Sequence, residues 1–380
     1  MKVVHIITGL ATGGAERALY NLLNGGLAKH CDNHVISLGN EGVVGPKIKT
    51  LGVPVTTLGM PNGRPSLSGL VKLRRSVRDF QPDLIQGWMY HGNLAATLAC
   101  TFAPRRPILV WNIRQSLYDL SYEKPMTRQI IRANRIFSSS PNALLYNSHL
   151  SQKQHEAFGI SSANGQVIPN GIDMKKFSFF SDLRQSLRSE LGIPVDAQVV
   201  GHVARLHPMK DHLLFLKAAV DLALRYSRTH FILIGRGVSL ENITWKQLVP
   251  VSIKDKFHFL NERDDVPALM CTMDIFCLSS AWGEGFPNVI GEAMAIGLPC
   301  VATDIGDIST IIGNTGVVVS PHNKEALASG IERLLLMPEE ERRMLGANAQ
   351  AQINANFKLE VIVKEYIELY ENLVSRKRVR

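Results

Sequence analysis

Residues 275–303, IFCLSSAWGEGFPNVIGEAMAIGLPCVAT, contain the pattern that decides the fold. The apolar run at 275–279 predicts a buried strand, and a glycine-rich turn then runs straight into a predicted helix. A second short apolar run at 300–303 predicts the next strand. Strand, helix and strand in this order are typical of a parallel βαβ unit.

The start of the helix inside this stretch predicts a phosphate site. Pro287 suits the first helical position, and Asn288 and Val289 then offer backbone N–H groups at the positive end of the helix dipole. Glu284 lies in the turn before the helix, and Glu292 lies about one turn into it. A carboxylate beside an anion site needs another partner, and sugar or ribose hydroxyls are the obvious candidates. The segment therefore suggests a nucleotide-sugar, held by its phosphate, ribose and sugar.

The same alternation of short apolar runs and helical patterns continues along the chain of 380 residues. Strands are expected at 3–8, 34–38, 55–58, 84–88, 108–113 and 143–147, and again at 199–204, 231–235, 257–260, 275–279, 300–303 and 316–319. A polar segment near 173–196 separates the two sets, which makes a (β/α)8 barrel less favoured. We expect an α/β protein with two Rossmann-like domains, at 1–180 and 181–357, and a helix with a basic tail at 358–380 that packs back on the first domain.

The distribution of charge indicates an anionic partner. Residues 1–180 carry 20 Lys and Arg against 9 Asp and Glu, a balance of +11, whereas residues 181–380 carry 22 against 24, a balance of −2. Membrane headgroups, a phosphorylated acceptor or nucleic acid would each fit the basic half. No apolar run approaches the roughly 20 residues of a membrane helix, and the N-terminal run is too short for a signal peptide.

Neither metal nor disulfide chemistry is expected. The five cysteines are scattered without metal-ligand spacing, which is typical of reduced thiols in a cytosolic protein. The sequence contains no Asp-x-Asp pair that would suggest a divalent ion bridging a diphosphate.

Two further loops follow expected strands and carry candidate ligand contacts. Gly13 and Gly14 let the backbone approach a ligand at a helix start, although such glycines also serve packing alone, and the loop does not match the dinucleotide fingerprint. Arg205 and Lys210 follow the first strand of the second half, where they could neutralise a diphosphate without a metal. The alternative interpretation is an ordinary surface loop with charged residues. The glycine-rich helix start in the same half of the chain makes this alternative less favoured.

Two helical faces rich in basic residues lie in the first half. One lies at residues 70–80, and the other comprises Arg128, Arg132 and Arg135, whose spacing places them on one face. Such a face can dock on anionic lipid at about 1 kcal/mol per basic residue, although either face alone is more typical of a solvated helix. The charge asymmetry favours a membrane surface. Nucleic acid is disfavoured because no basic run is interleaved with stacking aromatic residues.

His91 and Arg114 each follow an expected strand and are candidates to face a ligand crevice. Arg114 could contact an anion or a sugar. His91 is at least as typical of a histidine that is hydrogen-bonded at a helix start.

Together these residues make the chain resemble the retaining glycosyltransferases of family 4, which have the GT-B fold of two Rossmann-like domains facing each other across a cleft. The resemblance runs nearly end to end. It is carried by GGAE at 13–16, VIPNGID at 167–173 with Phe177, Arg205 with Lys210, FL at 259–260 with DVP at 265–267, the E-x7-E segment at 284–292, and EALA at 325–328.

The resemblance implies a role for each candidate. Arg205 and Lys210 would bind the diphosphate, Glu284 the transferred sugar, and Glu292 the ribose hydroxyls. The remaining donor contacts would come from Gly285, Phe286, Pro287, Asn288 and Val289 around sugar and phosphate, from Gly13 and Gly14 of the first domain, and from Leu260 to Arg263 around the base. Many members carry a histidine after the fifth strand in a V-x-T-x-H-like context. Arg114 stands near that place here, so Arg114 or His91 would take over its contact.

We therefore expect a retaining, metal-independent glycosyltransferase with no cofactor besides its nucleotide-sugar substrate, with a UDP-sugar favoured over a GDP-sugar. The acceptor would be a lipid-linked or phosphorylated, membrane-proximal glycan of surface polysaccharide biosynthesis. The protein would be cytoplasmic and peripheral on the inner face of the cytoplasmic membrane. Two alternatives stay open: a nucleotide-sugar 2-epimerase of the same fold, and a non-catalytic nucleotide-sugar-binding protein.

Overall fold

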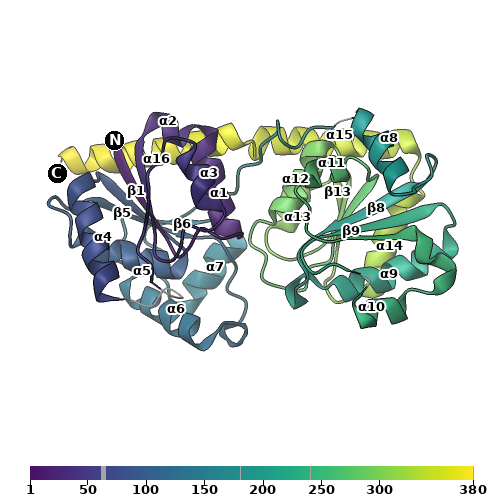
Figure 1. Cartoon of the computed structure of the whole chain (residues 1–380), viewed down its shortest axis with the longest axis horizontal. Helices are drawn as coiled ribbons and strands as arrows, with labels where there is room; N and C mark the ends of the chain where they lie inside the picture. Colours follow the sequence, from purple (N-terminus) through teal and green to yellow (C-terminus); the bar gives the residue numbers. More distant parts are fainter. Residues whose placement is uncertain (61–65, 180, 240, 380) are drawn as a thin grey trace. The chain divides into compact units, whose positions relative to one another are not determined.

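The computed structural model describes residues 1–60, 66–179, 181–239 and 241–379, and the chain divides into two compact units (Figure 1). The first unit comprises Met1–Gly171 together with Leu359–Arg380, and the second is the continuous stretch Ile172–Lys358. The boundary expected after residue 180 therefore lies within the range of the second unit. The expected C-terminal segment belongs, from Leu359 on, to the first unit.

A parallel sheet of seven strands forms the centre of the first unit, in the order β3-β2-β1-β4-β5-β6-β7. The strands are β1 (Lys2–Ile7), β2 (Asp32–Ser37), β3 (Val55–Thr57), β4 (Leu84–Trp88), β5 (Ile108–Ile113), β6 (Ala143–Tyr146) and β7 (Gly165–Val167). The six strands expected from sequence are present. The seventh, β7, was missed because Gly-Gln-Val shows neither an apolar run nor an alternation.

Helices cover both faces of this sheet. They are α1 (Gly14–Leu22), the π-helical turn η1 (Leu23–Leu27), α2 (Ala28–His30), α3 (Val44–Lys49), α4 (Leu67–Phe80), α5 (Met89–Cys100), the 3-10 turn η3 (Leu120–Tyr122), α6 (Pro125–Phe137), α7 (His149–Phe158) and α16 (Leu359–Val379). Successive side chains of a strand point to opposite faces, so Val3 and Ile7 of β1 lie in one apolar cluster and Val4 and Ile6 in another. The near-continuous apolar strands are thus explained by burial on both faces.

The last helix, α16, completes the core of the first unit (Figure 1, yellow) and lies against α1 and η1. Its buried side chains recur at helical spacing and belong to the same apolar cluster as β1: Leu359, Ile362, Val363, Tyr366 and Tyr370. Full burial of one such side chain stabilises a fold by about 1.5–3 kcal/mol. Gly25 of η1 permits the close approach, because a Cβ atom there would lie 2.8 Å from Leu359 Cγ and 2.9 Å from Val363 Cγ2.

The second unit contains a parallel sheet of six strands in the order β10-β9-β8-β11-β12-β13. The strands are β8 (Gln198–Val203), β9 (Thr229–Ile234), β10 (Phe257–Leu260), β11 (Ile275–Leu278), β12 (Cys300–Thr303) and β13 (Gly316–Val319), all expected from sequence. The helical elements are α8 (Ser181–Glu190), η4 (Pro208–Lys210), α9 (His212–Arg225), α10 (Ile243–Leu248), η5 (Val251–Lys256), α11 (Val266–Met270), α12 (Asn288–Ile296), α13 (Ile308–Ile312), α14 (Lys324–Leu335) and α15 (Glu339–Asn356). The strand order reverses between β8 and β11, and open α/β sheets bind ligands at the carboxyl end of such a point.

The glycine-rich stretch of the second unit enters α12 one residue later than expected. Pro287 has extended backbone angles, with φ −73° and ψ 102°, and is the N-cap rather than the first helical residue. Asn288 and Val289 are therefore the first two residues of the helix, whose opening N–H groups cannot reach a carbonyl of the helix itself. Gly297, with φ 90°, ends α12 in the left-handed conformation.

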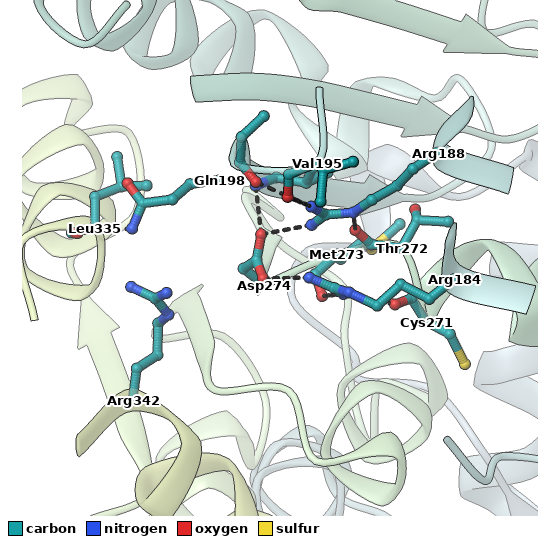
Figure 2. A network of polar contacts seen from close by, with 12 residues as sticks. Arg184, Arg188, Val195, Gln198, Cys271, Thr272, Met273, Asp274, Leu335 and Arg342 are labelled. Atoms are coloured by element: carbon teal, nitrogen blue, oxygen red, sulfur yellow. Dashed lines mark hydrogen bonds and ion pairs between the residues drawn. The ribbon is translucent and has the colours of Figure 1, made fainter. Parts of the chain in front are cut away.

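A buried ion-pair network ties α8 to the opposite, amino-terminal edge of this sheet (Figure 2). Asp274 immediately precedes β11 and accepts from Arg184 Nη2 at 2.6 Å, from Arg188 Nη2 at 2.8 Å and from the N–H of Val199 at 2.7 Å. Arg188 also donates to the carbonyls of Thr272 and Ala197. Burial lowers the pKa of Arg188, and the neighbouring charge of Asp274 opposes that shift. Because this network lies away from the carboxyl ends of the strands, we assign it to stability.

Candidate functional site

The predicted cationic and acidic residues of the second unit meet at the carboxyl edge of its sheet. Lys210 is the last residue of η4, which follows β8, and Glu284 lies in the turn after β11, the strand next to β8. Lys210 Nζ donates to Glu284 Oε1, and the two side chains are 15% and 9% exposed. The carboxylate also accepts from Ser280 Oγ at 2.6 Å. A largely buried ammonium and a buried carboxylate thus form an ion pair at the point where the strand order reverses.

The main chain on either side of this pair is fixed by direct bonds between the two loops. Ser279 Oγ lies 3.0 Å from the carbonyl oxygens of both Lys210 and Asp211, and the N–H of Ala281 donates to the carbonyl of Met209 at 2.8 Å. Asp211 adopts φ +41°, and its carboxylate caps α9 by accepting from the N–H of Leu214. The position of the lysine therefore depends on β11 as well as on its own loop.

A buried histidine lies within hydrogen-bonding distance of Ser279, the serine that contacts the carbonyl oxygen of Lys210. His202 of β8 places Nε2 3.2 Å from Ser279 Oγ, and its ring lies 4.6 Å, centroid to centroid, from that of His212. Burial lowers the pKa of His202 well below its ordinary value, with His212 and Lys210 adding to the shift. A neutral imidazole can donate from Nε2 to the serine, which then donates to the carbonyl of Lys210 or Asp211.

Close backbone approaches shape the turn that carries Glu284. Gly283 has φ +76°, and a Cβ atom there would lie 2.7 Å from Met209 Sδ. Gly306, with φ +73°, approaches the carbonyl oxygen of Gly285 so closely that a Cβ atom would lie 2.5 Å away. The N–H of Asp307 donates to the same carbonyl at 3.1 Å. The loop after β12 thus holds the turn from the other side.

The N-terminus of α12 and Glu292 lie next in the chain. Phe286 is buried and its ring packs 5.2 Å from that of Phe357, which anchors the turn against the end of α15. Asn288 and Val289 are half-buried. Glu292 is 6% exposed inside an otherwise apolar helix. Burial of a carboxylate requires polar or charged neighbours that compensate its charge.

Arg205 occupies the same loop as Lys210 but is exposed. The two cations create a positive local field, which contributes to the lowered pKa of His207 after its partial burial. An exposed guanidinium in this loop is free of the protein core, and its contact to a diphosphate stays a prediction.

The residues predicted to hold the base lie on the next loops of the same edge. Leu260 is the last residue of β10 and is half-buried, whereas Arg263 is exposed. Arg263 donates from Nε and Nη2 to the two carboxylate oxygens of Asp265, at 2.8 and 2.6 Å. This bidentate pair raises the pKa of Arg263 and lowers that of Asp265. Its guanidinium is thus engaged by its own loop.

In the first unit, Gly13 and Gly14 open α1, with Gly13 as the extended N-cap. The carboxylate of Glu16 lies over Gly13, where a Cβ atom would be 2.2 Å from Glu16 Oε2. Burial raises the pKa of Glu16, and the bond from its own N–H opposes the shift. This helix start therefore carries a carboxylate of its own, and a second anion would have to displace it.

Arg114 is the centre of a polar network at the carboxyl end of β5. Its Nη1 donates to Tyr366 Oη at 2.9 Å and to Asn112 Oδ1 at 3.2 Å, and its Nη2 donates to Asn170 Oδ1. The guanidinium also lies 5.7 Å above the ring of Trp88. Arg114 thus links β5 to α16 and to Asn170, near the end of the Met1–Gly171 stretch, a structural role that sequence reasoning missed.

His91 lies in the first turn of α5 and is half-buried, and burial lowers its pKa. The contact to the donor that was predicted for Arg114 or His91 stays a prediction.

Several residues of the site were not predicted. Ser279 and Ser280 supply the hydroxyls that hold Lys210 and Glu284, and the available signal was a pair of small polar residues directly after an apolar strand. The partners of Arg114 were hidden because Asn170 and Tyr366 are 56 and 252 residues away in sequence.

Within 1–60, 66–179, 181–239 and 241–379, no group of three or more His, Cys, Asp or Glu could hold a metal ion. None of the helices in that part of the chain is long and apolar enough to cross a membrane. The five cysteines are not paired with one another; Cys100 is half-buried and the other four are buried.

Two family models match the two halves of the chain. The model described as Glycosyltransferase Family 4 matches residues 12–176, and the model described as Glycosyl transferases group 1 matches residues 197–336. The EpsF protein of Bacillus subtilis is 27% identical over 322 residues, which cover 80% of this chain and 79% of that protein.

A second curated relative is an α-1,3-galactosyltransferase of Escherichia coli that uses UDP-Gal and α-D-GlcNAc-diphosphoundecaprenol. It is 26% identical over 218 residues, 56% of this chain and 55% of that protein. Several other curated relatives are likewise matched over about half to just under two thirds of their length.

Solved structures share the fold over nearly the whole chain. HepE of Anabaena, crystallised with UDP, superposes with a TM-score of 0.83 at 22% identity and covers 98% of this chain and 100% of that chain. Sucrose-phosphate synthase of Thermosynechococcus elongatus superposes with a TM-score of 0.80 at 17% identity and covers 99% and 100%.

Proposed function

The chain belongs to the family 4, group 1 glycosyltransferases and has the GT-B fold, and from this premise we propose that it moves a sugar from a nucleotide-diphosphate donor to a lipid-linked or membrane-proximal glycan. The observation that carries the proposal is the Lys210–Glu284 pair beside the N-terminus of α12, at the reversal of strand order in the second unit. This edge combines positive charge for phosphates with buried carboxylates for hydroxyls.

We propose that the second unit binds the donor. Lys210, the exposed Arg205 and the opening N–H groups of α12 would bind the diphosphate and stabilise its growing charge as the bond to the sugar breaks. Glu284 would accept hydrogen bonds from the sugar, and Glu292 from the ribose. The transfer would retain the anomeric configuration and need no metal, because these cations take the role of a divalent ion at the diphosphate.

A UDP-sugar is the donor that we place first. UDP is the nucleotide in the HepE crystal, and UDP-Gal is the donor named for the E. coli relative. Both statements concern those proteins, and they make uridine the first base to test here.

The acceptor would approach the basic first unit and belong to surface polysaccharide assembly. This unit, residues 1–171 with 359–380, carries 23 Lys and Arg against 12 Asp and Glu, a balance of +11, which suits a diphosphate-linked lipid or an anionic membrane surface. The named relatives include the E. coli galactosyltransferase and a mannosyltransferase of lipopolysaccharide core biosynthesis from Rhizobium meliloti. We propose a peripheral position on the inner face of the cytoplasmic membrane.

The donor half of the proposal is tested by thermal unfolding of the purified protein with UDP, GDP and ADP. A nucleotide at 100 times its Kd should stabilise the protein by about 2.7 kcal/mol. We expect UDP to raise the unfolding temperature most. If none of the three raises it, the proposed donor site is wrong.

The transferase activity is separated from its alternatives by incubation with and without acceptor. A transferase consumes UDP-sugar mainly when a polyprenyl-diphosphate-linked sugar is added, whereas a 2-epimerase converts the sugar of the donor alone. Glu284→Ala and Arg205→Ala should abolish transfer. Unchanged glycan assembly in cells that carry these variants would favour a binding protein without activity.

The membrane half is tested by co-sedimentation with liposomes. We expect more protein to sediment with vesicles that contain anionic phospholipid than with neutral vesicles, and less at high salt, because exposed charges are screened. Equal sedimentation with both vesicles contradicts the membrane proposal and leaves the donor site untouched.

A further inference from the structure

The ammonium that would bind the diphosphate is the same one that binds Glu284. Lys210 donates to Glu284 Oε1, the oxygen that also accepts from Ser280 at 2.6 Å. Both side chains are removed from most of the solvent, so the attraction between the two charges is only weakly screened. A lysine carries a single positive charge. It can neutralise one anion, so while Lys210 stays with Glu284 a diphosphate at this edge has only Arg205 and the opening N–H groups of α12 to compensate its charge.

The main chain of Lys210 has little freedom to move. Ser279 Oγ contacts its carbonyl oxygen at 3.0 Å, and the Ala281–Met209 bond joins the same two loops one residue further along on each side. The turn that contains Glu284 is likewise held in place, because Gly306 of the next loop lies close to the carbonyl oxygen of Gly285. The main chains of both partners are therefore set, and only the side chains can redistribute their contacts.

We propose that Glu284 competes with the donor's diphosphate for Lys210, and that hydroxyls of the donor sugar release the lysine by taking over Glu284. This inference rests on the proposed function of the site. Hydroxyl groups that donate to the carboxylate compensate its charge, so the lysine can turn to the phosphates at lower cost. Sugar and diphosphate recognition are then coupled through one ion pair. The nucleoside diphosphate that remains after transfer lacks the sugar, meets the re-formed pair and is bound less tightly.

The coupling is tested by calorimetric titration of wild type and Glu284→Gln with UDP and with UDP-glucose. Glutamine keeps the size of the side chain and an acceptor for Ser280, but it removes the charge that holds Lys210. We expect UDP to bind the variant about tenfold more tightly, equivalent to about 1.4 kcal/mol. UDP-glucose should change by less than about threefold, since the variant also loses its charge-assisted bonds to the sugar. The ratio of the two dissociation constants is the readout.

A matched control removes a carboxylate of the same unit elsewhere. Glu332 of α14 binds Arg225 at the end of α9, which precedes β9 and so lies toward the amino-terminal edge of the sheet. Glu332→Gln changes the net charge by the same amount, and both nucleotides should bind it as they bind wild type. The unfolding temperature of Glu284→Gln without nucleotide, close to that of wild type, verifies its fold.

The Lys210→Met variant shows whether the effect passes through the lysine. In that background Glu284→Gln should no longer tighten UDP. If the full tenfold gain persists, Glu284 repels the phosphates directly and competition for Lys210 is wrong. An equal gain for UDP and UDP-glucose, or no gain for UDP, also overturns the coupling while leaving the donor site intact. If wild type binds neither UDP, GDP nor ADP, the proposed function fails together with the coupling.

Discussion

Replacement of Asp274 by Asn should destabilise the second unit strongly without touching its donor edge. The carboxylate accepts three hydrogen bonds, from Arg184, Arg188 and the N–H of Val199. The side chain of Arg188 is only 6% exposed, so loss of the carboxylate charge leaves a guanidinium buried without an anion. Removal of one partner from such a pair costs about 3–5 kcal/mol. For a unit of this size, that corresponds to a fall of roughly 10 °C in its unfolding temperature.

The assay is differential scanning calorimetry combined with hydrogen exchange, because a chain of two units need not unfold in one step. Faster exchange should be confined to α8, β8 and β11, the elements that Asp274 joins. The exposed pair of Arg75 and Asp79 in α4 provides a matched control, with side chains 83% and 70% exposed. Asp79→Asn should leave the calorimetric trace unchanged, since exposed ion pairs contribute little.

A double variant tests the physical reason for this loss. Replacing Arg188 by Met together with Asp274 by Leu removes the two most buried charges of the network and leaves Arg184, whose side chain is 23% exposed and can turn to solvent. Apolar replacement of a buried pair is often close to neutral. The double variant should therefore recover most of the stability that Asp274→Asn loses. If Asp274→Asn costs less than about 1 kcal/mol, or if the double variant is the least stable of the series, the reasoning about an uncompensated guanidinium is refuted.

Three further outcomes follow from the described contacts. Ser280→Ala removes one bond to the buried carboxylate of Glu284, which should lower kcat about tenfold and stability by about 1.5–3 kcal/mol. An unchanged kcat under saturating donor would show that this hydroxyl does not orient the carboxylate. Burial lowers the pKa of His5 and of His155 from 6.5 to about 4, so the unfolded chain takes up protons first and stability should fall as the pH drops from about 6.5 to 4, by about 3 kcal/mol per histidine. Urea unfolding at pH 7 and pH 5 measures this loss, and equal midpoints would contradict it. Gly25→Leu should weaken the docking of α16 by about 1–3 kcal/mol, seen as faster proteolysis of that helix, whereas an unaltered digestion pattern would show that the helix can shift.

Much of the fold could be predicted because parallel strands buried on both faces leave short apolar runs that stand out in the sequence. The strands of both sheets were found in this way, apart from β7, whose Gly165-Gln166-Val167 lies at a sheet edge and carries no such signal. The start of α12 was misplaced by one residue, since proline is compatible with both the N-cap and the first helical position.

The candidate site could be predicted only as far as it lies in local motifs. Glu284 and Lys210 follow neighbouring strands, and the rule that ligands bind at the carboxyl edge places them close together. The identity of their contacts could not be predicted, because the ion pair, the serine bonds and the Arg114–Tyr366 bond depend on side-chain directions set by tertiary packing. The position of Arg114 after a strand indicated a ligand contact. It did not indicate the hydrogen bonds that Arg114 makes to residues of its own unit.

The dependence of the first unit on α16 has a consequence for the order in which the chain folds during synthesis. The second unit is a continuous stretch, Ile172–Lys358, and all its strands have been made before α16 is translated. The first unit contains the earliest residues of the chain, yet its core includes Tyr366 and Tyr370. Domains generally fold in order from the N-terminus during synthesis. Here we expect the N-terminal sheet to keep part of its apolar surface exposed until α16 has been synthesised. The first unit should therefore be the last part of the chain to become resistant to proteases.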